Sequence, residues 1–600
     1  MLTTPIKLAS LLVLVNGSLL FLAGICAYGQ PAPGVQGAGG PALSRAPSAQ
    51  RTITVDYSKQ GKPMSTFWAQ FGYDEPNYTY MKDGRKLLSE LAALSPVPVY
   101  VRCHNLLTTG DGEAALKWGS TNAYTEDAGG NPVYDWRITD SIFDSYISRG
   151  MKPLAEIGFM PEALSVHPEP YRHHWRPGVK YDSIYTGWAW PPVDYNKWGR
   201  LVEQWVRHCV QKYGEKEVGT WLWEVWNEPN ISYWKGTREE YFKLYDYAAA
   251  AVKRALPAAR VGGPATTGPG WDKAADWLET FLVHCATGEN AATGAKGVPL
   301  DFISYHAKGS PKFVDGHVRM NMNPQLKDVV KGFAIVKGSA FSQLPIYITE
   351  CDPEGCAACG MATNPENAYR NGTMYSSYTA ASFARILDSA ARYGVNLAGA
   401  TSWSFEFEGQ KWFDGFRDLA TNGVDKPVLN VFRMYGMMRG NRVDVEVGAQ
   451  RGGSVAGAVG GDGRGAGGMR GDGSVAGEGD VAANVLAAAD GHTMTVMLWN
   501  YSDDDLPGEV VNRVLQLKNI PAKRVNVQQF GIDEEHSNAY TVWKKMGSPQ
   551  DVSAAQYTVL EKAGGLQQIG KDLAAVVVDG GLSVPVRLPA HAVVLVRVGW

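Results

Sequence analysis

Eight short, β-rich apolar runs between residues 65 and 440 constrain the fold more than any other feature of this chain. Longer stretches with helical spacing separate them, such as 195–214 and 238–257, and these stretches end at Gly or Pro as helices do. The runs are FWAQFGY (67–73), PVYVRC (98–103), KPLAEIG (152–158), TWLWEVW (220–226), ARVGG (259–263), DFISYH (301–306), LPIYIT (344–349) and NLAGATSW (396–403). This rhythm is typical of parallel strands with helical crossovers, so we predict an α/β fold in which residues 65–440 form a (β/α)8 TIM barrel with loop insertions.

The chain after the barrel has a different pattern. Residues 449–481 are a Gly-rich, low-complexity stretch that we interpret as a flexible loop. Several short strands with turn residues between them predict a β-sandwich over residues 441–600. These strands are HTMTVMLWNYS, VNVQQFGID, AAVVVDGG and HAVVLVRVGW. Because the run RTITVDY alternates apolar with polar residues ahead of the first barrel strand, residues 51–64 are expected to add a strand to the sandwich.

The N-terminal segment, residues 1–29, has the pattern of a secretory signal peptide, with an apolar run and small residues at Ala27 and Gly29 for cleavage. We therefore expect a secreted or periplasmic protein. Cys26 leaves a lipidated anchor as an alternative. Residues 30–50, rich in Pro, Gly and Ala, are expected to be a disordered leader. No later stretch is apolar for long enough to span a bilayer, so we expect no membrane part in the mature form.

The overall charge and the aromatic content exclude some partners. A formal net charge of −3 in 600 residues implies neither nucleic acid nor an anionic membrane as a partner. The 19 tryptophans include rings that could stack on sugar faces, although composition alone favours the interpretation that most fill cores.

The expected export bears on the oxidation state of the cysteines. Removal of Cys26 leaves six, namely Cys103, Cys209, Cys285, Cys351, Cys356 and Cys359. The spacing C-x4-C-x2-C in ECDPEGCAACG is compatible with a metal or iron–sulfur site, but no fourth cysteine is well placed to complete it. We expect no metal and favour a local disulfide among Cys351, Cys356 and Cys359.

Polar and aromatic side chains follow strand after strand of the predicted barrel. The active site of such a barrel lies at the C-terminal ends of the strands, so these side chains should converge on one mouth. They are Arg102, His104, Glu156, Phe159, Asn227, Glu228, His306, Glu350, Trp403 and Glu408.

Two carboxylates in this set, Glu228 and Glu350, are what glycoside hydrolysis requires. One protonates the leaving oxygen while the other attacks or activates water. Each glutamate taken alone is more often an ion-pair partner than a catalyst. Other carboxylates compete for these roles, namely Glu75, Asp352, Glu354 and Glu406. The shared position of Glu228 and Glu350 at strand ends favours this pair.

Several motifs together resemble glycoside hydrolase family 39, the β-xylosidase and α-L-iduronidase family. They are WEVWNEPN, IYITE, FGYDEPNYTYMKDGRKLL, YDWRITDSIFDSYISRGMKPLAEIGFMPEAL and, near the C-terminus, GIDEEHSNAYTVWKKMGSP. The resemblance covers nearly the whole mature chain. It implies a retaining enzyme whose acid/base and nucleophile end the fourth and seventh barrel strands.

The resemblance also assigns roles to residues. It makes Glu228 the acid/base and Glu350 the nucleophile, with Asn227 on the sugar 2-hydroxyl. Sugar contacts are implied for His104, Phe159, His306, Trp403 and Glu408. The chain departs from the xylosidases at Lys308, where they carry a tyrosine. This cation can bind a carboxylate, either that of the nucleophile or that of a uronic acid.

From these features we expect a secreted retaining glycosidase, first a β-xylosidase that cleaves xylan-derived oligosaccharides, with no metal or organic cofactor. The alternatives are a glycosidase for another sugar, such as an α-L-arabinosidic or uronic acid substrate, and a non-catalytic polysaccharide-binding protein. The sequence leaves open the sugar, exo or endo action, and the oligomeric state.

Overall fold

The computed structural model describes residues 51–94, 96–403, 405–448 and 484–600. The predicted signal peptide (1–29), the leader (30–50) and the Gly-rich stretch (449–481) lie outside the described residues.

The predicted barrel is confirmed. Its strands are β2 (Gln70–Tyr73), β3 (Tyr100–Cys103), β6 (Lys152–Ile157), β7 (Leu222–Val225), β8 (Arg260–Thr266), β9 (Phe302–Lys308), β12 (Ile346–Asp352), β13 (Leu397–Ala400) and β14 (Ser402–Trp403). All their pairings are parallel. β13 pairs with β12 and β14 pairs with β2, so these two segments act as one eighth strand that closes the ring.

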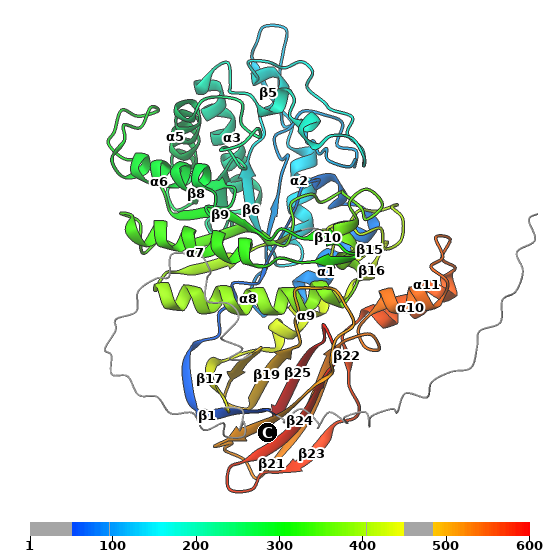
Figure 1. Ribbon diagram of the computed structural model, residues 1–600. Coiled ribbons are helices and arrows are strands. Elements are labelled where there is room, and N and C mark those ends of the chain that lie inside the picture. The colour runs from blue at the N-terminus through cyan, green and yellow to red at the C-terminus, as the bar shows by residue number, and fades with distance from the viewer. Residues whose placement is uncertain (1–50, 95, 404, 449–483) are drawn as a thin grey trace, which may run out of the picture. The chain divides into compact units, whose positions relative to one another are not determined.

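Helices connect successive barrel strands (Figure 1). They are α1 (Lys82–Ala92), α2 (Arg137–Ile147), α3 (Tyr195–Tyr213), α4 (Glu215–Val218), α5 (Arg238–Ala255), α6 (Asp272–Thr287), α7 (Asn323–Gly338) and α8 (Thr373–Tyr393), and α9 (Pro427–Met437) follows the last barrel strand. Local sequence fixes several starts. The Asp194 side chain accepts hydrogen bonds from the backbone N–H groups of Asn196 and Lys197 to cap α3, and Thr237 and Glu240 form a capping box on α5.

The loop insertions contain short elements, many of which follow a barrel strand. The strands are β4 (Tyr124–Glu126), β5 (Pro132–Tyr134), β10 (Lys312–Val314), β11 (His317–Arg319), β15 (Ala420–Thr421) and β16 (Val424–Asp425). The 3-10 helices are η1 (Pro76–Tyr78), η2 (Glu162–Leu164), η3 (Tyr181–Ile184), η4 (Gly187–Ala189) and η5 (Pro365–Asn371). Most of these insertions therefore belong to loops at the mouth of the barrel, where they can form the walls of a site.

The C-terminal part is a mixed β-structure in which ten strands form one continuous sheet. They are β1 (Arg51–Pro63), β17 (Asn441–Val447), β18 (Val485–Ala489), β19 (Thr493–Trp499), β20 (Val511–Lys518), β21 (Arg524–Ile532), β22 (Gln567–Gln568), β23 (Leu573–Val576), β24 (Leu582–Leu588) and β25 (Val593–Gly599). β1 runs antiparallel to β17 and parallel to β20. Two helices, α10 (Ala539–Lys545) and α11 (Ala554–Gly564), lie between β21 and β22 in the chain.

Trp221 and Trp223, in the region of the fourth strand, point outward and pack against the helices around the barrel. Trp221 contacts Phe143 of α2 with ring centroids 5.2 Å apart, and Trp223 contacts Trp205 of α3 at 5.2 Å. Burial of a large apolar side chain contributes about 1.5–3 kcal/mol. These rings therefore stabilise the strand that ends near Glu228, and they do not reach the barrel interior.

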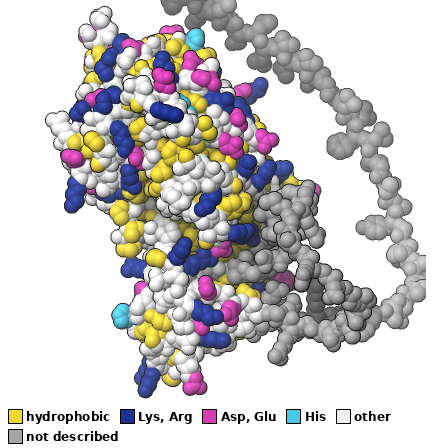
Figure 2. All heavy atoms as spheres, turned by 90° about the vertical axis from the view of Figure 1, so that its left-hand side faces the viewer, with side chains coloured by type: hydrophobic (Ala, Val, Ile, Leu, Met, Phe, Trp, Pro, Cys, Tyr) yellow, Lys and Arg dark blue, Asp and Glu magenta, His cyan; other side chains and the backbone are white. Residues whose placement is uncertain are grey.

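The surface carries charges of both signs. Figure 2 shows Lys and Arg side chains interspersed with Asp and Glu over the face drawn. No helix among the described residues is long and apolar enough to cross a membrane.

Candidate active site

A cavity of about 380 Å³ contains both predicted catalytic glutamates. Glu228 and Glu350 line it from the loop after β7 and from β12, and Lys308 lines it from the end of β9. All three lie at or beyond the C-terminal ends of barrel strands, where parallel barrels place their active sites.

Period-two alternation along the strands builds the interior below this cavity. Leu154, Leu222 and Phe302 form an apolar layer with Tyr347. Two residues further along β6 and β7, Glu156 and Glu224 form the next layer with Arg102 of β3. The alternation thus places one guanidinium inside the barrel against two carboxylates, directly below the mouth.

Arg102 links this charged layer to the catalytic residues. It is fully buried, with its Nη2 atom 3.0 Å from Glu156 Oε2 and its Nε donating to Glu224. It also donates to Asn227 Oδ1 at 3.0 Å and to Glu350 Oε1 at 3.3 Å. Burial raises the pKa of Glu156 to about 7, despite the opposing effect of Arg102.

The backbone around Glu228 adopts a sparsely populated conformation. Trp226 and Glu228 have φ angles of +72° and +44°, which cost L residues about 1–3 kcal/mol each. The Trp226 N–H donates to Ile157 O at 3.1 Å and the Glu228 N–H donates to Ala265 O at 2.9 Å. These bonds to the neighbouring strands hold the turn that presents the Glu228 carboxylate to the cavity.

Glu350 lies among cations. Lys308 Nζ contacts its Oε2, Arg417 Nη2 donates to the same oxygen at 3.3 Å, and His104 Nε2 lies 3.4 Å from its Oε1. Burial alone would raise the pKa of Glu350, but Lys308, His306, His104 and Arg417 together lower it well below its ordinary value. The carboxylate is therefore held ionised, as a nucleophile must be.

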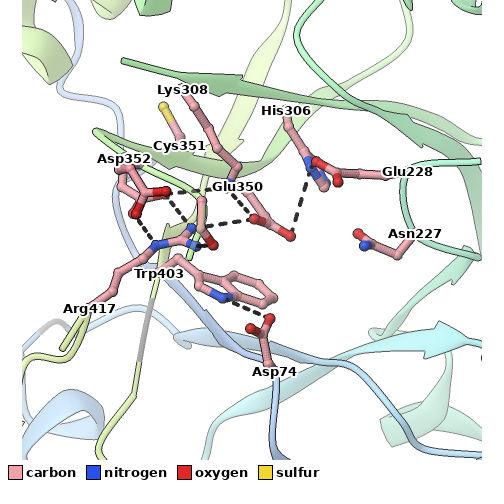
Figure 3. A network of polar contacts seen from close by, with 12 residues as sticks. Asp74, Asn227, Glu228, His306, Lys308, Glu350, Cys351, Asp352, Trp403 and Arg417 are labelled. Carbon is pink, nitrogen blue, oxygen red and sulfur yellow. Dashed lines mark hydrogen bonds and ion pairs between the residues drawn. The ribbon is translucent and has the colours of Figure 1, made fainter. Parts of the chain in front are cut away.

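His306 lies between the two glutamates (Figure 3). Its Nδ1 atom is 2.8 Å from Glu228 Oε1 and 3.7 Å from Glu350 Oε1. The two carboxylate oxygens cannot be farther apart than the sum of these distances. Retaining glycosidases hold their two carboxyl groups ~5–5.5 Å apart, and inverting ones hold them ~6.5–9.5 Å apart. The limit applies to one oxygen of each group, and it is compatible with the retaining arrangement.

Trp403 is buried and lies beside Glu350 (Figure 3). Its Nε1 donates to Asp74 Oδ1 at 3.1 Å, and its ring lies 5.3 Å from the Arg102 guanidinium and 5.6 Å from that of Arg417. A Cβ atom at Gly72 would approach this ring to 2.1 Å. The close approach of β2 to the indole therefore requires glycine at position 72.

His104 and Phe159 line a small extension of the site. This cavity of about 20 Å³ shares Asp74 and Tyr233 with the larger one. Phe159 contacts His104 with centroids 5.8 Å apart, and Trp118 and Trp188 complete the wall.

The structure does not bring Glu408 to the site. Its Oε2 accepts a hydrogen bond from the backbone N–H of Asp83 in α1 at 3.0 Å, and the glutamate lines neither cavity. The other predicted site residues lie around the two glutamates. They are His104, Phe159, Asn227, His306, Lys308 and Trp403.

Several residues of the site were not selected from the sequence. Asp74 lines both cavities, and it directly follows the first apolar run, so the rule that selected the other strand ends would have found it. Tyr233 and Arg417 come from insertion loops with no strand pattern. Arg417 binds Asp352 Oδ1 through Nη2 at 2.6 Å and also Glu350, a contact that only the folded chain reveals.

The loop after β12 forms part of the cavity rim. Cys356 and Cys359 line the cavity with their Cα atoms 5.4 Å apart, and Cys351 is buried. Arg370 donates to Cys356 O at 3.1 Å and pairs with Glu354, whose carboxylate accepts from the Cys356 N–H. Within the described residues, no group of three or more His, Cys, Asp or Glu is arranged to hold a metal ion.

Comparison with known proteins identifies one family. The family described as "Glycosyl hydrolases family 39" matches residues 51–568. A β-xylosidase of Geobacillus stearothermophilus is 29% identical over 487 residues, 77% of this chain and 79% of that protein. An α-L-iduronidase of Mus musculus is 25% identical over 393 residues, 60% of this chain and 55% of that protein. The crystal structure of the GH39 enzyme from Xanthomonas axonopodis pv. citri has the same fold, with a TM-score of 0.70 at 23% identity over 93% of this chain and 99% of that chain.

Proposed function

The chain belongs to glycosyl hydrolase family 39, and on that premise we propose that it is a retaining β-xylosidase that acts on xylan-derived oligosaccharides by double displacement. The observation that carries the mechanism is the placement of one histidine nitrogen 2.8 Å from Glu228 and 3.7 Å from Glu350. The resemblance to β-xylosidases supports the choice of sugar.

In the first step, Glu350 attacks the anomeric carbon while Glu228 donates a proton to the departing oxygen. The Glu350 carboxylate becomes the ester of the glycosyl-enzyme, and the leaving group departs as an alcohol. In the second step, Glu228 removes a proton from a water molecule, which displaces Glu350 from the anomeric carbon. Two inversions at that carbon give a product with retained configuration.

The surrounding residues support each step. The cations beside Glu350 keep it ionised before the attack, and the hydrogen bond from Arg102 to Asn227 supports a role of Asn227 in binding the 2-hydroxyl. Trp118 and Trp188 bound the small extension of the site, whose volume is only about 20 Å³, and this closed end supports exo action.

A second candidate is a glycosidase for a uronic acid, because Lys308 lines the cavity and offers a cation to a substrate carboxylate. The charges favour the first candidate. Asp74, Glu228, Glu350 and Glu354 also line the cavity, and Lys308 already contacts Glu350. A neutral sugar avoids repulsion by these carboxylates.

A panel of 4-nitrophenyl glycosides tests the proposal. Release of nitrophenol from the β-D-xyloside, at a rate at least tenfold above that from the α-L-arabinosides and the uronides, is expected. Preference for an α-L-iduronide would support the second candidate. Carbohydrate binding without release from any member would contradict the hydrolase and favour a binding protein.

Export remains part of the proposal. The signal-like pattern of residues 1–29 and a Cys356–Cys359 disulfide suit an oxidising compartment. Mass mapping of the 351–359 peptide with and without reductant tests the bond, and N-terminal sequencing of protein recovered from the medium tests cleavage after residue 29.

A further inference from the structure

A groove of about 500 Å³ lies beside the catalytic cavity. It is formed by residues 229–232 and 234–236, which follow Glu228 in the chain, together with Trp190 and residues of α6. Its volume is within the ~300–1,000 Å³ range of small-molecule sites. The mechanism described above uses none of the side chains of this groove.

The position of the groove relates it to the leaving group. Ile231 borders both the groove and the catalytic cavity, and Pro229, directly after the proton donor Glu228, begins the groove wall. The departing oxygen receives its proton from Glu228. The part of a substrate beyond that oxygen must therefore leave on the side of this loop.

The groove walls have the chemistry of a sugar-binding surface. Trp190, Trp234 and Trp277 line it, and tryptophan rings stack on the apolar faces of sugars. Trp234 and Trp277 are mostly buried, at 4% and 8% exposed, and Trp190 is the most exposed of the three.

The charge of the groove is opposite to that of the catalytic cavity. Lys235 and Lys273 line the groove, and the described residues that line it include no Asp or Glu. Neither ammonium has a carboxylate partner in the described chain. Lys235 lies 5.4 Å from the Trp190 ring centroid, and Lys273 lies 5.5 Å from that of Trp271. These cations are available to a ligand, unlike Lys308, which contacts Glu350.

We infer that this groove binds the leaving-group portion of an oligosaccharide that carries an anionic group, a carboxylate or a sulfate. The inference rests on the proposed function and refines its substrate. The residue released from the non-reducing end is neutral, and the acidic sugar lies beyond the cleaved bond, with its ring on the tryptophans and its anion between Lys235 and Lys273.

The test compares one neutral and two acidic oligosaccharides that share the same terminal sugar, one acidic form with a uronate and the other with a sulfate. The double variant Lys235→Met/Lys273→Met removes the cations. Lys243→Met is the matched control, since Lys243 also lies over an aromatic ring, that of Tyr195 at 4.4 Å, and does not line the groove. Ser232→Trp places bulk in the groove at an exposed position.

We expect the double variant to lose about tenfold in kcat/KM on an acidic oligosaccharide, with less than a twofold change on the neutral one and on the aryl glycoside. A loss on the uronate oligosaccharide identifies a carboxylate as the anion that is bound, and a loss on the sulfated one identifies a sulfate. Ser232→Trp should weaken both oligosaccharides and spare the aryl glycoside. Added salt should reduce kcat/KM for the acidic substrate alone.

Equal losses on neutral and acidic oligosaccharides, or the same loss in Lys243→Met, would overturn the inference. A change of oligomeric state in the double variant, measured by light scattering, would instead assign the groove to a contact between copies and would also overturn it. If the wild type released nothing from any aryl glycoside, the proposed function would fail by itself. Calorimetric titration of the wild type with the acidic oligosaccharide would still decide whether the groove binds it.

Discussion

Glu228 and Glu350 line the same cavity, but their surroundings differ. Glu228 shares a hydrogen bond with one histidine and lies near Tyr185 and Tyr233, whose pKa values its charge helps to raise. Glu350 lies against Lys308, Arg417 and Arg102. Two identical side chains thus lie in different environments, and the cations around Glu350 hold that carboxylate as an anion.

The largest effect on activity is expected when Glu350, the carboxylate held as an anion, is replaced. Glu350→Ala removes the nucleophile, so kcat should fall by at least about 10⁴-fold on every substrate, whatever its leaving group. Steady-state and single-turnover rates measure the loss, and circular dichroism controls for folding. A variant that retained a tenth of the wild-type rate would contradict the assigned role.

The other half of the comparison predicts a selective loss. Glu228→Ala should reduce kcat by about 10²–10⁴-fold on a poor leaving group such as an alkyl or sugar aglycone. On a dinitrophenyl glycoside, which needs no protonation, the first step should be nearly normal, and azide should accelerate turnover to a glycosyl azide of retained configuration. Equal losses on both classes of leaving group, without azide rescue, would remove Glu228 from the acid/base role.

A smaller change should make the two carboxylates more alike. Lys308→Met removes a cation that lowers the pKa of Glu350, so that pKa rises and the anion is lost at a higher pH. The acid limb of kcat/KM should move up by about one pH unit or more. Lys312→Met, on β10 and exposed, is the control. An unchanged acid limb would show that Lys308 does not set the ionisation of Glu350.

The smallest effect on activity is expected for a change at Glu156, below the cavity. This change should instead alter the free energy of unfolding. The folded-state pKa of Glu156 is about 7 against an ordinary 4.5, so the folded protein binds this proton more tightly than the unfolded chain. Its contribution is present below about pH 4.5 and is lost as the pH rises toward 7, by an amount on the order of 3 kcal/mol. Glu156→Gln should flatten the pH dependence of the unfolding free energy in that window. Urea titrations at several pH values measure this free energy. An unchanged dependence on pH in Glu156→Gln would contradict the assignment.

Much of the fold was predictable from local pattern, because parallel barrel strands are short apolar runs between helices. All eight predicted runs overlap a barrel strand. Strand-end position also located Glu228 and Glu350 correctly in one cavity. Period-two alternation determines both results, and it can be read from the chain.

Other parts of the site depend on contacts between distant segments. Arg417 reaches Glu350 from a loop 67 residues later in the chain, and Tyr233 depends on how its insertion folds over the mouth. Glu408 was selected for its place near a strand end, and in the folded chain its carboxylate accepts a hydrogen bond from the backbone N–H of Asp83 in α1. Loop geometry, unlike strand periodicity, leaves no regular pattern in the sequence.

The central claim, that Glu350 is the nucleophile and Glu228 is not, is tested most directly by covalent trapping. The protein is incubated with the 2-deoxy-2-fluoro dinitrophenyl form of the glycoside that the panel identifies, and its intact mass and peptic peptides are measured. We predict the addition of one fluoroglycosyl group, located on Glu350 and absent from Glu350→Ala. A label on Glu228, or an active enzyme that forms no adduct and releases a product of inverted configuration, would contradict the account.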